Sequence, residues 1–200
     1  MLSQADANAK LNLGKTATLL LEGSTHGLDI LAQILLGFGI RTFHRCLTVE
    51  EARLAFEQRP LDLIVADPNL PSGDGYEFLK WARRNTASPN CYAPMILTTG
   101  HVQMSQVQRA RDVGANFIVA KPLQPGILWQ RILWIARENR AFVESPSYVG
   151  PDRRFRNIGP PPGISGRRDG DLGLDVGVAI APNMSDGELS AMMKPMKVVL

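Results

Sequence analysis

The chain has 200 residues, 44% of them hydrophobic, and a formal net charge of +3. This length allows one domain with an appendage or two small domains, and so small a net charge says little about partners. The two cysteines are too few for a disulfide framework or a zinc site. No stretch approaches the roughly 18 apolar residues of a membrane span, and the polar N-terminus lacks the apolar core of a signal peptide. We therefore expect a cytoplasmic protein.

We expect residues 1–15 to be a disordered lead-in. Five strand–helix repeats follow them. Short apolar runs between turn residues predict the strands, and apolar residues at helical spacing, such as Leu28, Leu31 and Leu35, predict the helices. The expected strands cover residues 16–22, 40–44, 61–66, 95–98 and 117–120. The expected helices cover residues 28–38, 49–58, 76–84, 102–113 and 127–142. This alternation predicts an α/β domain over residues 16–143, with a five-stranded parallel, doubly wound sheet and helices on both faces.

The third expected strand ends in a carboxylate at Asp67, within the stretch LDLIVADPNLPSGDG. The apolar run before it suits a strand that is buried on both faces, and the turn formers after it predict a loop. Open α/β sheets bind their ligands at the carboxyl ends of the strands. At the same edge the first, fourth and fifth strands end in Glu22, Thr99 and Lys121. The sequence therefore predicts a cleft with two acids, a hydroxyl and an ammonium group.

This set of side chains suits phosphoryl transfer to a carboxylate. Asp67 is the expected nucleophile. Lys121 is expected to pair with phosphoryl oxygens as a point charge, and Thr99 to donate a hydrogen bond to one of them. Glu22, Asp67 and a loop carbonyl, that of Asn69, are the expected ligands of a Mg²⁺ ion.

Four motifs in this order resemble the receiver domain of two-component response regulators, the chemotaxis-regulator-like family. They are DPNLPSGDG with Asp67, PMILTTG with Thr99, GAN at residues 114–116, and KPL with Lys121. The resemblance covers residues 16–143 and implies a flavodoxin-like sheet with the strand order 2-1-3-4-5. It also implies phosphoryl transfer to Asp67 from a histidine kinase or phosphotransfer protein, dependence on Mg²⁺, and a cis Lys121–Pro122 bond. Such a protein is a signalling module that acts on a downstream protein, and we do not expect an enzyme.

Two positions depart from the family pattern. The family carries two adjacent acids after the first strand, whereas this chain has Glu22 followed by Gly23, so one Mg²⁺ ligand is missing. The aromatic switch residue of the family is replaced by Ile118. Two hypotheses stay open: a receiver that is phosphorylated on Asp67, and a degenerate receiver that binds its partners without phosphorylation.

The composition changes after residue 143. Residues 145–200 contain seven Pro and eight Gly, so we expect residues 144–200 to be a mostly disordered tail. A capping box at residues 185–188 predicts one short helix over 185–193, and no DNA-binding domain is recognisable. Five arginines of the tail form a candidate binding site: Arg153, Arg154, Arg156, Arg167 and Arg168. They either keep a linker solvated or bind a cyclic nucleotide such as cyclic di-GMP or another anionic partner, because guanidinium groups recognise phosphates and guanine edges.

Overall fold

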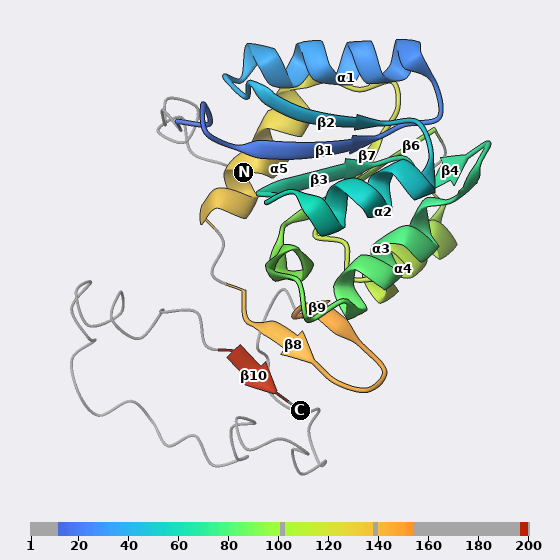
Figure 1. The fold of residues 1–200 in the computed structure, drawn as a ribbon, viewed down its shortest axis with the longest axis vertical. Helices are drawn as coiled ribbons and strands as arrows, with labels where there is room; N and C mark the ends of the chain where they lie inside the picture. The colour runs from blue at the N-terminus through green and yellow to red at the C-terminus, as the bar shows by residue number, and fades with distance from the viewer. Residues whose placement is uncertain (1–11, 101–102, 138–139, 154–196, 200) are drawn as a thin grey trace, which may run out of the picture.

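The centre of the molecule is a five-stranded parallel sheet with the strand order β2-β1-β3-β6-β7 (Figure 1). The computed structural model describes residues 12–100, 103–137, 140–153 and 197–199. The five strands are β1 (Ala17–Leu21), β2 (Thr42–Cys46), β3 (Leu63–Ala66), β6 (Met95–Thr99) and β7 (Phe117–Ala120). In chain order they are the five predicted strands, so the order 2-1-3-4-5 is confirmed.

Helices cover both faces of this sheet. One face packs against α1 (Thr25–Gly37) and α5 (Pro125–Arg137). The other face packs against α2 (Val49–Gln58), α3 (Gly75–Arg84) and α4 (Met104–Asp112). All residues of β3 and β6 are buried, as the continuous apolar runs predict for strands covered on both sides. None of the helices in the described ranges is long and apolar enough to cross a membrane.

Local capping sets the starts of α1 and α2. α1 begins at Thr25, three residues before the expected helix, because the Ser24 side chain caps it and accepts a hydrogen bond from Gly27 N at 3.0 Å. α2 begins at Val49 behind a capping box between Thr48 and Glu51. The spacing of apolar residues predicts only the part of a helix that has a buried face. It does not predict a polar first turn.

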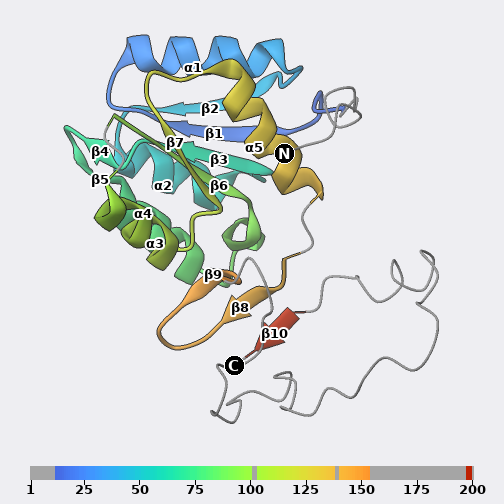
Figure 2. The ribbon, with the colours of Figure 1, turned by 180° about the vertical axis from the view of Figure 1, so that it is seen from behind.

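The C-terminal part differs most from the sequence prediction. The expected helix over 127–142 ends earlier, with α5 at Arg137, and the chain then forms an antiparallel hairpin of β8 (Phe142–Glu144) and β9 (Val149–Pro151). β10 (Lys197–Val199) pairs in parallel with β8. Residues 144–151 of the expected, mostly disordered tail are therefore ordered in the hairpin, which lies beside the C-terminal ends of α3 and α4 (Figures 1 and 2). The expected lead-in up to residue 11 and the expected helix over 185–193 lie outside the described residues.

A buried arginine connects the hairpin to the domain. Arg83 in α3 is only 1% exposed, and burial lowers its pKa to about 10. Its guanidinium donates to Gly114 O at 2.9 Å, to Ala93 O at 2.8 Å and to Cys91 O. The Phe142 ring of β8 lies 5.3 Å from the Arg83 Cζ atom. Arg83 thus joins α3, the loops before β6 and β7, and the hairpin.

Gly114 provides the space in which the hairpin docks. Its φ of +84° is in the left-handed region, and a Cβ there would lie 2.6 Å from Val149 O. Tyr148 next to it is buried, and its hydroxyl donates to Pro151 O at 2.7 Å. The hairpin is therefore part of the packed domain, although the sequence assigned residues 144–151 to the tail.

Candidate functional site

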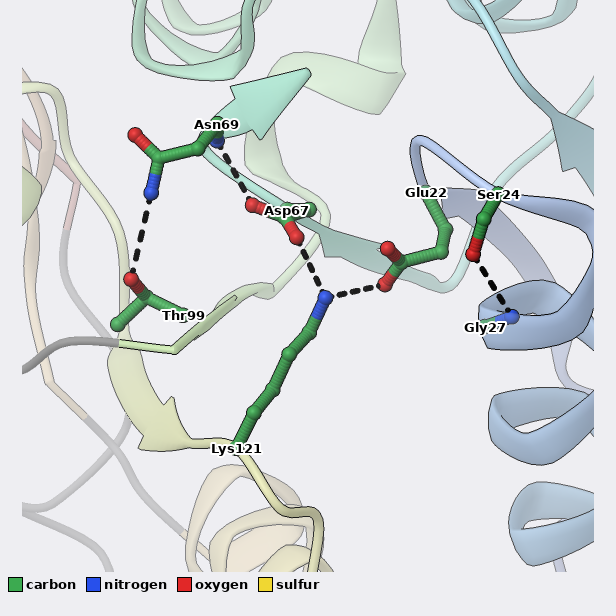
Figure 3. Close-up of polar contacts among 7 residues, drawn as sticks. All are labelled: Glu22, Ser24, Gly27, Asp67, Asn69, Thr99 and Lys121. Atoms are coloured by element: carbon green, nitrogen blue, oxygen red, sulfur yellow. Dashed lines mark hydrogen bonds and ion pairs between the residues drawn. The ribbon is translucent and has the colours of Figure 1, made fainter. Parts of the chain in front are cut away.

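The predicted site residues meet at the carboxyl edge of the sheet. The parallel ladder continues one residue beyond the strands, because Glu22 N donates to Cys46 O at 3.1 Å and Asp67 N donates to Leu21 O at 2.8 Å. Lys121 N donates to Thr99 O at 2.7 Å. These backbone bonds fix the positions from which the functional side chains project into one cleft (Figure 3).

An ammonium group bridges the two carboxylates of the site. Lys121 Nζ lies 2.6 Å from Glu22 Oε2 and 2.5 Å from Asp67 Oδ2. Glu22 and Asp67 are buried, at 6% and 8% exposure, so their charges need this cation. Burial lowers the pKa of Lys121, but the hydrogen bonds and charges of Asp67 and Glu22 outweigh burial and raise the pKa above its ordinary value. Lys121 is therefore charged and held against Asp67.

The loop after β3 holds the Asp67 carboxylate from the other side. Asp67 Oδ1 accepts a hydrogen bond from Asn69 N at 2.7 Å, and Asn69 Nδ2 lies 3.5 Å from Thr99 Oγ1 (Figure 3). The loop folds into two short paired strands, β4 (Asn69–Leu70) and β5 (Gly73–Asp74). Asp67 is thus oriented through both of its oxygens, one toward the loop and one toward Lys121.

Gly75 closes this loop at a position that excludes any side chain. A Cβ at Gly75 would lie 2.2 Å from Asp67 O, and Gly75 N donates to Pro68 O at 3.0 Å. Asp74 beside it caps α3 by accepting from Tyr76 N at 2.8 Å. The last two residues of the DPNLPSGDG motif therefore pack the loop and start the next helix. The Lys121–Pro122 bond is cis, as the resemblance implies.

Two glycines beside β1 shape the acidic side of the site. A Cβ at Gly27, in the first turn of α1, would lie 2.6 Å from Glu22 Cγ. Gly27 therefore makes room for the Glu22 side chain. This role was not predicted, because the sequence shows only a lone glycine in the first turn of a helix. A Cβ at Gly23 would lie 2.6 Å from Pro71 Cδ. The position of the missing acid is thus filled by the Pro71 ring.

The oxygen ligands that this chain keeps, without the second acid of the family, fit a magnesium ion. Mg²⁺ is commonly bound through one or two carboxylates plus substrate phosphate oxygens and water. Glu22 and Asp67 supply two carboxylates in one cleft, and Asn69, whose carbonyl is the third expected ligand, is hydrogen-bonded to Asp67 through its backbone N. In the described ranges, no group of three or more His, Cys, Asp or Glu side chains could hold a metal. The donor set fits an ion that a phosphate helps to hold.

The two other sequence predictions lie away from this cleft. Ile118 is half-buried and packs against the core below α2, α3 and α4, so its position holds no polar ring. Of the five tail arginines, only Arg153 lies within the described residues. Its guanidinium pairs with Asp112 at 3.0 Å and lies 3.8 Å from the centre of the Tyr148 ring. Among the described residues the structure therefore places Arg153 beside Asp112 and Tyr148 rather than at Asp67. The other four arginines lie outside the described residues, and the ligand of the tail stays a prediction.

Comparisons with known proteins match the domain rather than the whole chain. The family model of the response regulator receiver domain matches residues 19–133. The transcriptional regulatory protein KdpE of Escherichia coli is 32% identical over 105 residues, which cover 52% of this chain and 44% of KdpE. The probable chemotaxis protein CheY of Rhizobium etli is 28% identical over 108 residues, which cover 54% of this chain and 82% of that protein. The match to histidine kinase 1 of Arabidopsis thaliana covers only 7% of that kinase.

Solved structures show the same fold. A two-component response regulator from Clostridium difficile is 25% identical, with a TM-score of 0.56 over 62% of this chain and 98% of that one. A CheY-like receiver domain protein from Methanospirillum hungatei is also 25% identical, with a TM-score of 0.53 over 58% of this chain and 90% of that one. The chain therefore belongs to the family of response regulator receiver domains, the modules of two-component signalling.

Proposed function

We propose that the protein accepts a phosphoryl group on Asp67 and passes the signal on through protein–protein contacts. The observation that carries this proposal is the contact of Lys121 Nζ with both Asp67 and Glu22. A cation in this place orients the Asp67 carboxylate, and it already lies where negative charge will develop on the phosphoryl group. Receiver domains in general interact with histidine kinases and phosphotransfer proteins, and we propose such a protein as the phosphoryl donor.

The transfer is a displacement at phosphorus. An Asp67 carboxylate oxygen attacks the phosphorus of a phosphohistidine, the P–N bond breaks, and its electron pair stays on the imidazole nitrogen. The product is an aspartyl acyl phosphate. Lys121 then pairs with a phosphoryl oxygen instead of the Asp67 carboxylate, and the Thr99 hydroxyl donates to another. The backbone at both positions is fixed, because Lys121 N donates a hydrogen bond to Thr99 O, and this supports these roles.

Receiver domains generally bind Mg²⁺ at the acidic site, and we propose Glu22, Asp67 and the Asn69 carbonyl as its ligands here. When bound, the ion neutralises charge on the phosphoryl oxygens. The Pro71 ring occupies the place of a further carboxylate at position 23. We therefore propose that the ion binds weakly without a phosphodonor and more tightly in its presence.

The test is incubation of the whole protein with acetyl phosphate and Mg²⁺, followed by intact mass measurement. The proposal predicts the gain of one phosphoryl group in the wild type and none in Asp67→Asn. Asp29→Asn, which removes an exposed carboxylate on α1, is the matched control and should react like the wild type. Circular dichroism checks that each variant is folded. No gain in the folded wild type would contradict the proposal and favour a module that binds without phosphorylation.

A further inference from the structure

A cavity of about 340 Å³ lies between α4, β7, α5 and the β8–β9 hairpin, away from the phosphorylation cleft. Val107 and Arg111 of α4, Phe117 of β7, Trp134 of α5 and Tyr148 of the hairpin line it. We propose that this α4–α5 cavity binds a nucleoside phosphate, with the base against its aromatic side chains and the phosphate on its arginines. The inference does not rest on phosphorylation of Asp67.

Aromatic side chains form one part of the cavity wall. The rings of Phe117 and Trp134 lie edge to face, with centroids 5.9 Å apart. Trp134 is 38% exposed, which is unusual for so large an apolar side chain. Tyr148 closes the hairpin end of the cavity, where it is buried. Arg153 covers a face of Tyr148, and Arg131 and Arg140 lie over Phe117, so Trp134 offers the exposed ring to a planar base. Stacking needs a π-face and no particular hydrogen-bond pattern.

Positive charge forms the other part of the wall. Four arginines and one acid line the cavity, namely Arg111, Arg131, Arg140, Arg153 and Asp152. Arg153 is paired with Asp112, and Arg140 donates to Asp152 O at 3.5 Å. Within the described ranges no carboxylate pairs with Arg111 or Arg131. Among the described residues no acid competes for these two guanidinium groups, so an anion in the cavity can pair with them.

Arg131 connects the two parts of the wall. Its Cζ atom lies 5.3 Å from the centre of the Phe117 ring, so the guanidinium is held over the aromatic surface. A ligand that stacks beside Phe117 would thus place an attached phosphate next to Arg131. Guanidinium groups bind phosphates through two parallel hydrogen bonds.

The size of the cavity favours a small molecule over a peptide. Pockets for small ligands measure about 300 to 1,000 Å³, and about 340 Å³ is at the small end of this range. Side chains of α4, β7, α5 and the hairpin line the cavity, which is partly open to solvent, whereas a docked helix needs a long open groove. A nucleotide with one base fits both the volume and the combination of rings and arginines.

The experiment is calorimetric titration of the unphosphorylated full-length protein with AMP, GMP, CMP and UMP. At least one of them should bind with a dissociation constant below about 1 mM, within the ordinary range of weak binding. Arg131→Ala should weaken that binding by roughly tenfold or more, the effect of a lost charge-assisted hydrogen bond. Trp134→Ala should weaken it as well, and added salt should reduce it.

Arg53→Ala is the matched control, because Arg53 also lies over an aromatic ring, 5.0 Å from the centre of Trp81, but on α2 outside the cavity. This variant should bind like the wild type. The proposal is overturned if none of the nucleotides binds at 5 mM, about five times the expected limit, or if binding is the same in Arg131→Ala. It is also overturned if inorganic phosphate, ribose 5-phosphate or a glutamate-rich peptide binds as tightly as the nucleotides. Thermal melting of each variant confirms that it is folded.

Discussion

At the scale of single residues, the candidate site depends on the cation of Lys121 between two buried carboxylates. Glu22 and Asp67 repel each other across the cleft unless a positive charge lies between them, and Lys121 Nζ contacts both. The same cation that holds the resting site together would meet the incoming phosphoryl group. The positive charge of Lys121 thus serves both its structural role, between the two carboxylates, and its proposed functional role, toward the phosphoryl group.

Replacement of Lys121 by Met should therefore reduce both stability and phosphorylation. We expect the free energy of unfolding at pH 7 to fall by about 2 kcal/mol, less than for a fully buried pair because Lys121 is partly exposed. The raised pKa of Lys121 means that the folded state binds this proton more tightly than the unfolded state. The stabilisation is fully present below the ordinary pKa of 10.5 and is lost as the pH rises through the higher folded value.

Urea unfolding of the wild type and Lys121→Met at a series of pH values measures this difference. It should be constant from neutral pH to about 10 and shrink above that. Lys80→Met removes an exposed lysine of α3 and is the control. An equal stability of wild type and Lys121→Met at pH 7 would contradict the electrostatic role.

Gly75→Ala should damage the site through packing alone. The new Cβ would lie 2.2 Å from Asp67 O, so the loop must shift. We expect a loss of about 2 to 3 kcal/mol in the free energy of unfolding and slower phosphorylation of Asp67. Gly37→Ala is the matched control, because a Cβ there meets nothing within 4 Å and should be neutral or stabilising. Denaturant unfolding measures the change in the free energy of unfolding for both variants. Equal changes in Gly75→Ala and Gly37→Ala would contradict this role of Gly75.

At the scale of elements, strands were more predictable than helix ends. The runs that form β3 and β6 are apolar throughout because both faces of the sheet are covered. The apolar period of α1 begins at Leu28, whereas the helix begins at Thr25 behind the Ser24 cap, which lies outside that period. The hairpin was missed for another reason. Residues 142–151 contain glycine and proline, and their stability comes from docking on Arg83 and Gly114, which are far away in the sequence.

The Arg83 side chain should be the main connection between the hairpin and the domain. Arg83→Met leaves the carbonyl groups of Gly114 and Ala93 without their buried donor. We expect a loss of about 2 to 4 kcal/mol in the free energy of unfolding and faster amide hydrogen exchange in residues 142–151. Arg84→Met, at the exposed neighbouring position, should change neither. Hydrogen exchange with mass spectrometry measures the exchange rates of residues 142–151. Unchanged rates in Arg83→Met would contradict the role of Arg83 in holding the hairpin on the domain.

At the scale of the whole molecule, the sheet brings four distant sequence positions to one edge. Glu22, Asp67, Thr99 and Lys121 could be predicted as a set because each lies at a strand end, and parallel strands end at the same edge. The effects of Gly23 and Gly27 could not be predicted, since they depend on which side chains lie beside them in space. The α4–α5 cavity was also beyond the sequence, because its wall combines two helices, an edge strand and the unexpected hairpin.

The central claim is that Asp67 carries the phosphoryl group. The most direct measurement is reduction of the acetyl phosphate-treated protein with borohydride, followed by peptide mapping. Reduction of an aspartyl acyl phosphate converts that residue to homoserine, so the account predicts homoserine at position 67 in the peptide that contains DPNLPSGDG, and unmodified aspartate without acetyl phosphate. Homoserine at another aspartate, or a phosphate that survives reduction on a serine or threonine, would contradict it.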